Sequence, residues 1–262
     1  MASALPSLSD QVVRLRIIAF LLFAGYGWIL LHGATGMSDV ALTGAFLLLS
    51  IAVSFFIPHR RFCNWLWLVG ALFLAIIHGV NWLTSQKGIG LFLEHASQIG
   101  LPILLFFIAR SKPDAMIAKT ALVFIAMTFV FHGLFAIGIP SSFAWLNHAT
   151  PDHFLFMTKE TLGIDSDGVA RQVLLAAGVL DLVAAAAIFS SRFRKAGLVY
   201  MLIWGFLTAL ARPVAYVELD TLGEDLMRWF PEFLIRTPHG GIPLALLGWP
   251  SLSCCSPKNP KS

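Results

Sequence analysis

Charged residues are scarce in this chain of 262 residues, since Asp, Glu, Lys and Arg together make up only 12% of the sequence. Soluble globular domains carry about 25% charged residues. Hydrophobic residues make up 58% of the chain, and the mean hydropathy is +0.80. These values exclude a water-soluble globular protein and predict a polytopic α-helical membrane protein whose main partner is the lipid bilayer.

Several motifs of soluble proteins are also absent. The sequence has no Walker loop, no dinucleotide-binding fingerprint and no G-x-S-x-G motif, which argues against soluble-type nucleotide or hydrolase chemistry. The net charge is +4, but no basic patch is interleaved with aromatic residues, so no nucleic-acid partner is predicted. The three cysteines fall on the side that is predicted below to be cytoplasmic, where a reducing compartment disfavours a structural disulfide, and the adjacent Cys254 and Cys255 are either inert or lipidated.

Apolar runs recur along the whole chain and define eight segments of spanning length. These predicted spans are 15–33, 40–57, 64–83, 90–109, 117–139, 171–189, 197–215 and 233–252. Twelve of the 18 basic residues fall on one side of the predicted membrane, together with only two acidic residues. The twelve are Arg14, Arg16, Arg60, Arg61, Arg110, Lys112, Lys119, Arg192, Arg194, Lys195, Lys258 and Lys261. The positive-inside rule therefore predicts a cytoplasmic (inner) membrane protein with both termini in the cytoplasm.

Two short similarities indicate an internal repeat. The pair His32-Gly33 recurs 100 residues later as His132-Gly133. With an offset of 141 residues, "FLEHASQIGLPILL" at 92–105 aligns with "FLIRTPHGGIPLAL" at 233–246. The offset grows only across the predicted outer loops, where insertions are tolerated.

The repeat divides the chain into two halves of four helices each, residues 1–115 and 116–262. An even number of helices gives both halves the same orientation, so the repeats are parallel. The predicted fold class is thus an all-α polytopic membrane bundle of about eight transmembrane helices in two parallel four-helix repeats. The halves differ at one mid-span position, where Ser50 in the first half aligns with Asp181 in the second.

The second half resembles the DoxX-like four-helix membrane proteins. The similarity lies in "FHGLFAIGIP" at 131–140 and "GVLDLVAAAAIF" at 178–189, where an acid, Asp181, follows Gly178. The first half departs from this pattern, since "GAFLLLSIAV" contains a glycine but no acid. The resemblance implies a bundle of four-helix units. It also implies a role like that of the family's better-understood members, which are membrane subunits linked to sulfur or thiol oxidation and quinone reduction.

Polar residues of six predicted helices lie at similar depth. Counting about 1.5 Å per residue from the cytoplasmic ends places them about 20–25 Å into a hydrocarbon core of about 30 Å. They are His32, His78, His95, His132, His239 and Arg212, with Gln98 close by. A single histidine near a helix end is commonly interfacial, whereas a layer of them on faces rich in small residues predicts an interior polar site.

This layer is predicted to bind a cofactor or ligand. Neutral imidazole ligates haem iron, and His32 with His132 are at a suitable depth for such a pair. Histidine and arginine can instead hold a quinone carbonyl and exchange its proton, while Arg212 could also simply snorkel to the interface. Asp181 lies about 12 Å from the cytoplasmic edge and acts either as a proton relay or as a helix-packing hydrogen-bond partner.

Three functional hypotheses follow. The first is a redox-linked membrane subunit that binds quinone or haem and works with a membrane or outer-side redox partner. The second is a small-solute or proton-coupled transporter, which the parallel repeats and the prolines in both final helices favour. The third is a non-catalytic membrane scaffold. The outer loop at 140–170, with His148 and His153, is predicted to be ordinary solvated loop or helix-cap sequence.

Overall fold

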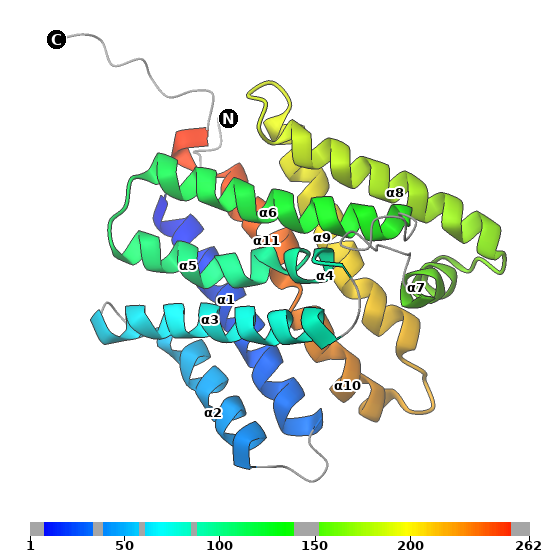
Figure 1. Cartoon of the computed structure of the whole chain (residues 1–262), viewed down its shortest axis with the longest axis horizontal. Coiled ribbons are helices and arrows are strands. Elements are labelled where there is room, and N and C mark those ends of the chain that lie inside the picture. Colours follow the sequence, from blue (N-terminus) through cyan, green and yellow to red (C-terminus); the bar gives the residue numbers. More distant parts are fainter. Residues whose placement is uncertain (1–7, 34–38, 58–60, 85–87, 139–151, 253–262) are drawn as a thin grey trace, which may run out of the picture.

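The computed structural model describes residues 8–33, 39–57, 61–84, 88–138 and 152–252, and all regular structure in these ranges is helical (Figure 1). The helices follow one another along the chain, which confirms the all-α prediction for the described residues. They are α1 (Leu8–Gly33), α2 (Asp39–Ser54), α3 (Arg61–Thr84), α4 (Gly90–Leu93), α5 (Ala96–Ala109), α6 (Asp114–Ile137), α7 (Asp152–Leu162), α8 (Asp167–Ala187), α9 (Arg194–Tyr216), α10 (Leu222–Leu234), α11 (Thr237–Leu247) and the 3-10 turn η2 (Pro250–Leu252).

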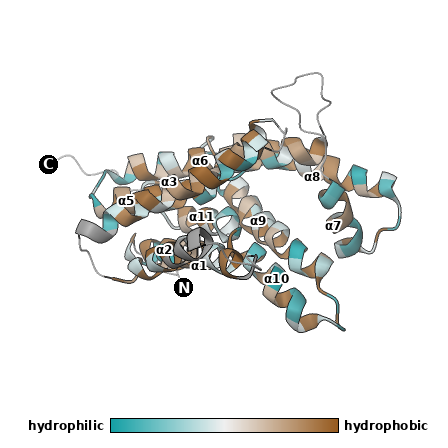
Figure 2. Ribbon diagram, turned by 60° about the horizontal axis from the view of Figure 1, so that its bottom comes forward, coloured by the Kyte–Doolittle hydropathy of each residue, from teal (hydrophilic) through white to brown (hydrophobic). Residues whose placement is uncertain are grey.

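Five of these helices, α1, α3, α6, α8 and α9, are long and apolar enough to cross a membrane. The hydropathy colouring in Figure 2 shows apolar residues dominating the long helices, with hydrophilic residues on α7, on α10 and at helix ends. The chain therefore has the character of a multi-pass membrane protein. The other three predicted spans are shorter, because α2 has 16 residues and the spans 90–109 and 233–252 are each interrupted, leaving α5 with 14 residues and α11 with 11.

One face of α3 is apolar and exposed along its whole length. Its residues recur every three or four positions, which is the spacing of a single helical face. They are Trp65, Val69, Leu72, Ile76, Val80 and Leu83. A continuous exposed apolar stripe of this kind would be unstable in water, and it is the surface that a lipid-facing helix presents.

The helices pack in matching pairs in the two predicted halves. In the first half α1 packs on α2 and α3 on α5, and in the second half α6 packs on α8 and α9 on α11. The first helix of each predicted half also packs on the last helix of the other half, since α1 contacts α11 and α6 contacts α5. These pairings are the ones that the predicted repeat requires, although the repeat itself and its boundaries at 1–115 and 116–262 remain a prediction.

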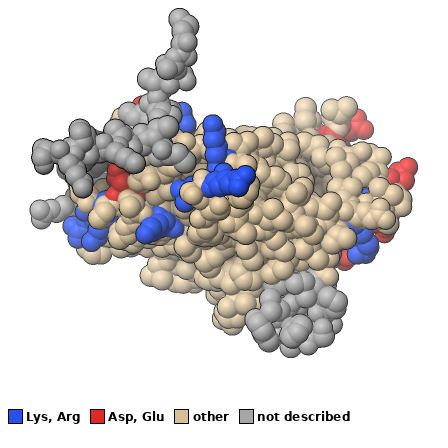
Figure 3. All heavy atoms as spheres, turned by 90° about the horizontal axis from the view of Figure 1, so that it is seen from above, with Lys and Arg blue, Asp and Glu red and all other residues tan. Residues whose placement is uncertain are grey.

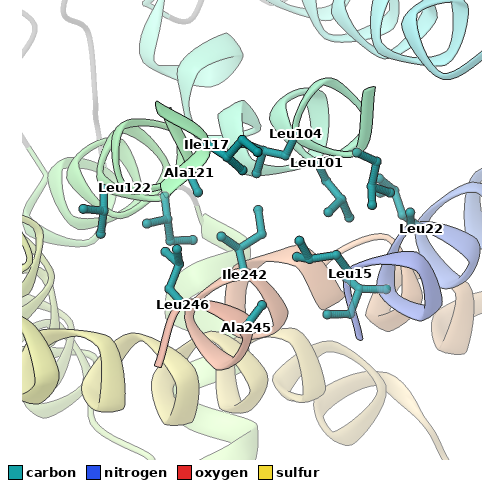
Figure 4. Close-up of a cluster of buried hydrophobic side chains, with 14 of the residues drawn as sticks. Leu15, Leu22, Leu101, Leu104, Ile117, Ala121, Leu122, Ile242, Ala245 and Leu246 are labelled. Atoms are coloured by element: carbon teal, nitrogen blue, oxygen red, sulfur yellow. The ribbon is translucent and has the colours of Figure 1, made fainter. Parts of the chain in front are cut away.

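The apolar core lies where the first helix and the interrupted last helix of each half meet. Figure 4 shows side chains from α1, α5, α6 and α11 converging on one cluster. The labelled members are Leu15, Leu22, Leu101, Leu104, Ile117, Ala121, Leu122, Ile242, Ala245 and Leu246, and all are buried. This cluster fills the centre of the bundle, so the polar site described below lies beside the core and not within it.

The predicted outer loop 140–170 contains a helix that the sequence interpretation did not place. Helix α7 runs from Asp152 to Leu162, with an acid in its first turn, and Gly163 follows it in the left-handed conformation at φ 64°. That conformation ends a helix and is easily adopted by glycine. Phe154 and Met157 of α7 are buried in a small apolar cluster with Phe135, so the helix is packed on the bundle. His148 lies outside the described residues.

Charges are unevenly distributed on the surface. On the face seen in Figure 3, most of the Lys and Arg lie toward the left end and the middle, whereas most of the Asp and Glu lie at the right end, together with some basic residues. The right end is the one where α7 is found in Figure 1. Uncharged surface fills most of the area between these groups, as a lipid-exposed belt would.

Candidate functional site

A cavity of about 240 Å³ lies between α4, α6, α7, α8, α9 and the α10–α11 connection. Much of its wall is apolar and includes Phe135, Phe154, Met157 and Leu174. The polar part of its lining consists of Glu94, His95, His132, His153, Thr158, Thr161, Asp181, Trp204, Thr208, Arg212, Arg236 and His239. An apolar cavity with a limited set of convergent polar groups is the usual form of a small-molecule site.

Several of the predicted site residues come together here. His95, His132, His239 and Arg212 all line the cavity, and so does Asp181. His78 and Gln98 lie behind the wall, where both are buried. The ring of His78 stacks on that of His95 with 3.7 Å between centroids. His32 lies in the last turn of α1, and its side chain is outside the described part of the structure.

His132 and Asp181 form the central pair of the site. The imidazole Nδ1 of His132 lies 3.1 Å from Oδ2 of Asp181, which is fully buried. Since a carboxylate at this position accepts, Nδ1–H of His132 donates, and Nε2 is the nitrogen left for a ligand. The hydroxyl of Tyr200 donates to the other carboxylate oxygen, Oδ1, at 2.8 Å. Both oxygens of the carboxylate are thus bound, and the orientation of the imidazole is fixed.

Two glycines make this pairing possible. Helices α6 and α8 cross where Gly133 meets Gly178, and a Cβ added to Gly178 would lie 2.5 Å from the carbonyl oxygen of Gly133. Only residues without a side chain allow two helix backbones to approach this closely. Gly133 follows His132 directly, and Asp181 lies three residues after Gly178, so the crossing brings imidazole and carboxylate together.

A cluster of two arginines and one glutamate borders the cavity. Glu232 Oε2 lies 2.5 Å from Nη1 of Arg236 and 3.8 Å from Nη1 of Arg212. All three side chains are largely buried, with exposed fractions between 16% and 24%. Buried guanidinium groups need such carboxylate partners, so the predicted clamp residue Arg212 is part of an ion-pair network and does not snorkel alone.

The interruptions of the two final helices have the same hydrogen bonds. At the first break the side chain of His95 contacts the carbonyl of Leu91, four residues earlier, and its backbone N–H donates to the carbonyl three residues earlier. At the second break the Arg236 side chain donates to the carbonyl of Glu232, again four residues earlier, and its backbone N–H again donates three residues earlier. His95 and Arg236 are aligned by the 141-residue offset, and both line the cavity.

A second polar cluster lies behind His95. The hydroxyl of Tyr26 donates to Oε1 of Gln98 at 2.6 Å, and Nε2 of His78 lies 2.8 Å from the Tyr26 oxygen and 3.0 Å from the same Gln98 oxygen. Because the hydroxyl proton goes to Gln98, His78 donates from Nε2 to both oxygens. The buried imidazole, amide and hydroxyl thus support each other in the wall against which His95 stacks.

Several residues of this region were not identified from the sequence. They are Tyr26, Glu94, His153, Tyr200, Trp204, Glu232 and Arg236. One available signal was the spacing of four residues on α9, which places Tyr200, Trp204, Thr208 and Arg212 on one helical face. The other was the 141-residue offset, which places Arg236 on His95. His153, predicted to be a solvated loop residue, lines the cavity instead.

Other predicted features lie away from the cavity. Asp167, in the "DSDG" sequence at 165–168, pairs with Lys159 at 2.7 Å on the surface, as expected for a solvated cap residue. Within the described ranges, no group of three or more His, Cys, Asp or Glu side chains is arranged to hold a metal ion. Cys254 and Cys255 lie outside these ranges.

Comparisons with models of known protein families, with curated proteins and with solved structures find no match for the chain. The resemblance of its second half to DoxX-like membrane proteins therefore stays a prediction, based on the residues around Gly178 and Asp181.

Proposed function

We propose that this chain is a multi-pass protein of a cytoplasmic (inner) membrane whose cavity binds a lipophilic molecule with a carbonyl head group, of the quinone class. His132 exchanges a proton with that head group. The observation that carries the proposal is the buried His132–Asp181 pair in the wall of an otherwise largely apolar cavity. In this proposal both termini lie in the cytoplasm, which the positive-inside distribution of the basic residues supports.

The polar lining favours a neutral ligand that accepts hydrogen bonds. Histidine, tryptophan, threonine and arginine side chains supply many donors. Of the two carboxylates in the lining, Asp181 has both oxygens bound, and Glu94 Oε1 lies 3.6 Å from Nδ1 of His95. Two arginines and two carboxylates line the cavity, so the formal charge of the lining does not select an anion. A carbonyl oxygen accepts hydrogen bonds without bringing a charge into this environment.

The arrangement at His132 supports proton exchange. A general acid or base needs a second group that fixes its tautomer and orientation, and Asp181 supplies it through Nδ1. Reduction of a quinone to a quinol adds two electrons and two protons. His132, as the imidazolium paired with Asp181, holds one carbonyl oxygen through Nε2–H and gives it one proton. The second proton comes from water, and the two electrons come from a membrane or outer-side redox partner. The quinone is preferred to haem because the arrangement in the largely apolar wall is a single histidine oriented by a carboxylate, which suits proton exchange.

The test begins with the purified protein in lipid nanodiscs. Its organic extract should contain a quinone, and 1,4-naphthoquinone should bind to the quinone-depleted protein. Asp181→Asn should weaken this binding by at least about tenfold, because loss of a hydrogen bond to a charged group costs about 1.5–3 kcal/mol. Asp167→Asn is the matched control, being the same substitution in an exposed residue of the same helix.

Absence of a quinone from the extract together with no binding of the naphthoquinone would overturn the proposal. Equal affinities of the Asp181→Asn and Asp167→Asn variants for 1,4-naphthoquinone would contradict the role of the His132–Asp181 pair in binding. An absorption spectrum before and after dithionite reduction, recorded on the same sample, tests for haem independently, since a Soret band that shifts on reduction would replace quinone by haem.

A transporter is the second candidate, and the matching breaks at His95 and Arg236 favour it. Transporters built from repeats place their substrate where interrupted helices of both halves meet. A proton-coupled carrier of this type should lose substrate uptake into proteoliposomes in Asp181→Asn and keep it in Asp167→Asn. Unchanged uptake in Asp181→Asn would contradict the proton-coupled transporter hypothesis.

A further inference from the structure

Two buried nitrogen atoms in the cavity wall have no hydrogen-bond partner among the described residues. They are Nε1 of Trp204 and Nε2 of His239. Leaving a buried polar group unpaired costs about 1–3 kcal/mol, and native structures have few such groups. The indole N–H only donates, so the partner that Trp204 lacks must be an acceptor.

The fold holds these two residues close together. Helices α9 and α11 cross at Gly205, where an added Cβ would lie 2.6–2.8 Å from backbone atoms of His239 and Gly240. Trp204 precedes this glycine directly, so Trp204 and His239 are neighbours at the helix crossing, and both line the cavity. The hydroxyl of Thr208, one turn further along α9, donates to the Trp204 carbonyl at 2.9 Å and is thus engaged locally.

His239 also borders a second, much smaller cavity. This cavity has a volume of about 10 Å³ and is lined by Thr128, Phe129, His132, Thr208 and His239. It is just large enough for about one water molecule. His132 and His239 both border this cavity, whereas Trp204 does not, so the Trp204 indole is the donor that lies apart from the His132–Asp181 pair.

We infer that Trp204 and His239 form a second subsite, which takes an acceptor oxygen of the ligand at a distance from the oxygen held by His132. This inference rests on the proposed function and narrows its ligand class. The cavity then selects a molecule with two separated carbonyl oxygens, a dione, over a molecule of the same size with a single carbonyl.

The experiment compares two probes of similar shape, 1,4-naphthoquinone with two carbonyls and 1-tetralone with one, by equilibrium dialysis against nanodiscs. The wild-type protein should bind the dione about 2- to 12-fold more tightly, which is the contribution of one neutral hydrogen bond. In Trp204→Phe the ratio of the two affinities should fall toward one. Trp65→Phe is the matched control, because Trp65 is 53% exposed on α3, and it should keep the wild-type ratio.

His239→Gln provides a second variant that preserves a polar side chain, and thermal unfolding of each variant reports on its folding. Equal binding of both probes by the wild type, or a ratio that neither variant changes, would overturn the second subsite while leaving the proposed function standing. If the wild type binds neither probe, the proposed function fails and the subsite fails with it.

Discussion

The crossing of α6 and α8 gives the sharpest prediction, because it places the His132–Asp181 pair through two glycines. In Gly178→Ala the new Cβ would lie 2.5 Å from the carbonyl oxygen of Gly133 and 2.7 Å from Cγ1 of Ile137. Ordinary contact begins near 3.4 Å, so the helices must separate by about 0.9 Å, the difference between 3.4 and 2.5 Å. The atom in the way belongs to a helix backbone and cannot rotate aside.

This displacement has two costs. Overpacking of a well-packed interface costs about 1–3 kcal/mol. A separation of this size would also stretch the hydrogen bond between His132 and Asp181 from 3.1 Å to about 4 Å, which is beyond hydrogen-bonding distance. We therefore expect Gly178→Ala to lower the free energy of unfolding by at least about 2 kcal/mol. Naphthoquinone binding should weaken to the level of Asp181→Asn.

The measurement is reversible unfolding in mixed lipid–detergent micelles, followed by tryptophan fluorescence. Gly79→Ala on α3 is the control, since no atom lies within 4 Å of its added Cβ. Alanine is the better helix former, by up to about 1 kcal/mol, so this control should be neutral or slightly stabilising. If Gly178→Ala unfolds with the same free energy as Gly79→Ala, the close crossing does not hold the pair, and the explanation given for the site is wrong.

Two further predictions concern Asp181 and the turn before α10. Tyr200→Phe removes the 2.8 Å hydrogen bond to Asp181 and should lower the free energy of unfolding by about 1.5–3 kcal/mol. Tyr216→Phe is the control, since it keeps the ring that stacks on Trp229 and should cost less. Equal losses in the two variants would contradict a stabilising role for the Tyr200–Asp181 hydrogen bond. The hydrogen bond from the Thr221 hydroxyl and, to a smaller extent, the one from the backbone N–H of Glu218 lower the pKa of Asp225 below its ordinary value. The turn should thus be stable above about pH 4 and loosen as the pH falls through the lower folded pKa. Hydrogen exchange of residues 218–225 should show this change, and Asp225→Asn should abolish it.

The depth of the polar residues could be predicted from the sequence because the rise of an α-helix per residue is constant. Counting from the predicted cytoplasmic helix ends was enough to group His95, His132, His239 and Arg212, and these four residues line one cavity. The same counting grouped His78 with them, which the structure places just behind the wall, stacked on His95.

The rotation of each helix could not be obtained in this way. Tyr26 and Trp204 are of types that also form the aromatic belts at membrane interfaces, and only the packing of neighbouring helices decides whether they face lipid or the interior. The break at Arg236 and the position of α7 depend on contacts between distant segments, such as Phe154 against Phe135. A pattern read along one segment carries no information about such contacts.

The two predicted halves have matching breaks but contribute unequally to the site. The breaks supply one cavity residue each, His95 from the first half and Arg236 from the second. The central pair comes from the second half alone, since Asp181 aligns with Ser50, and a serine hydroxyl in that position cannot hold a histidine as a carboxylate does. The predicted repeat is therefore asymmetric at the site, because only one of the two aligned positions carries a carboxylate.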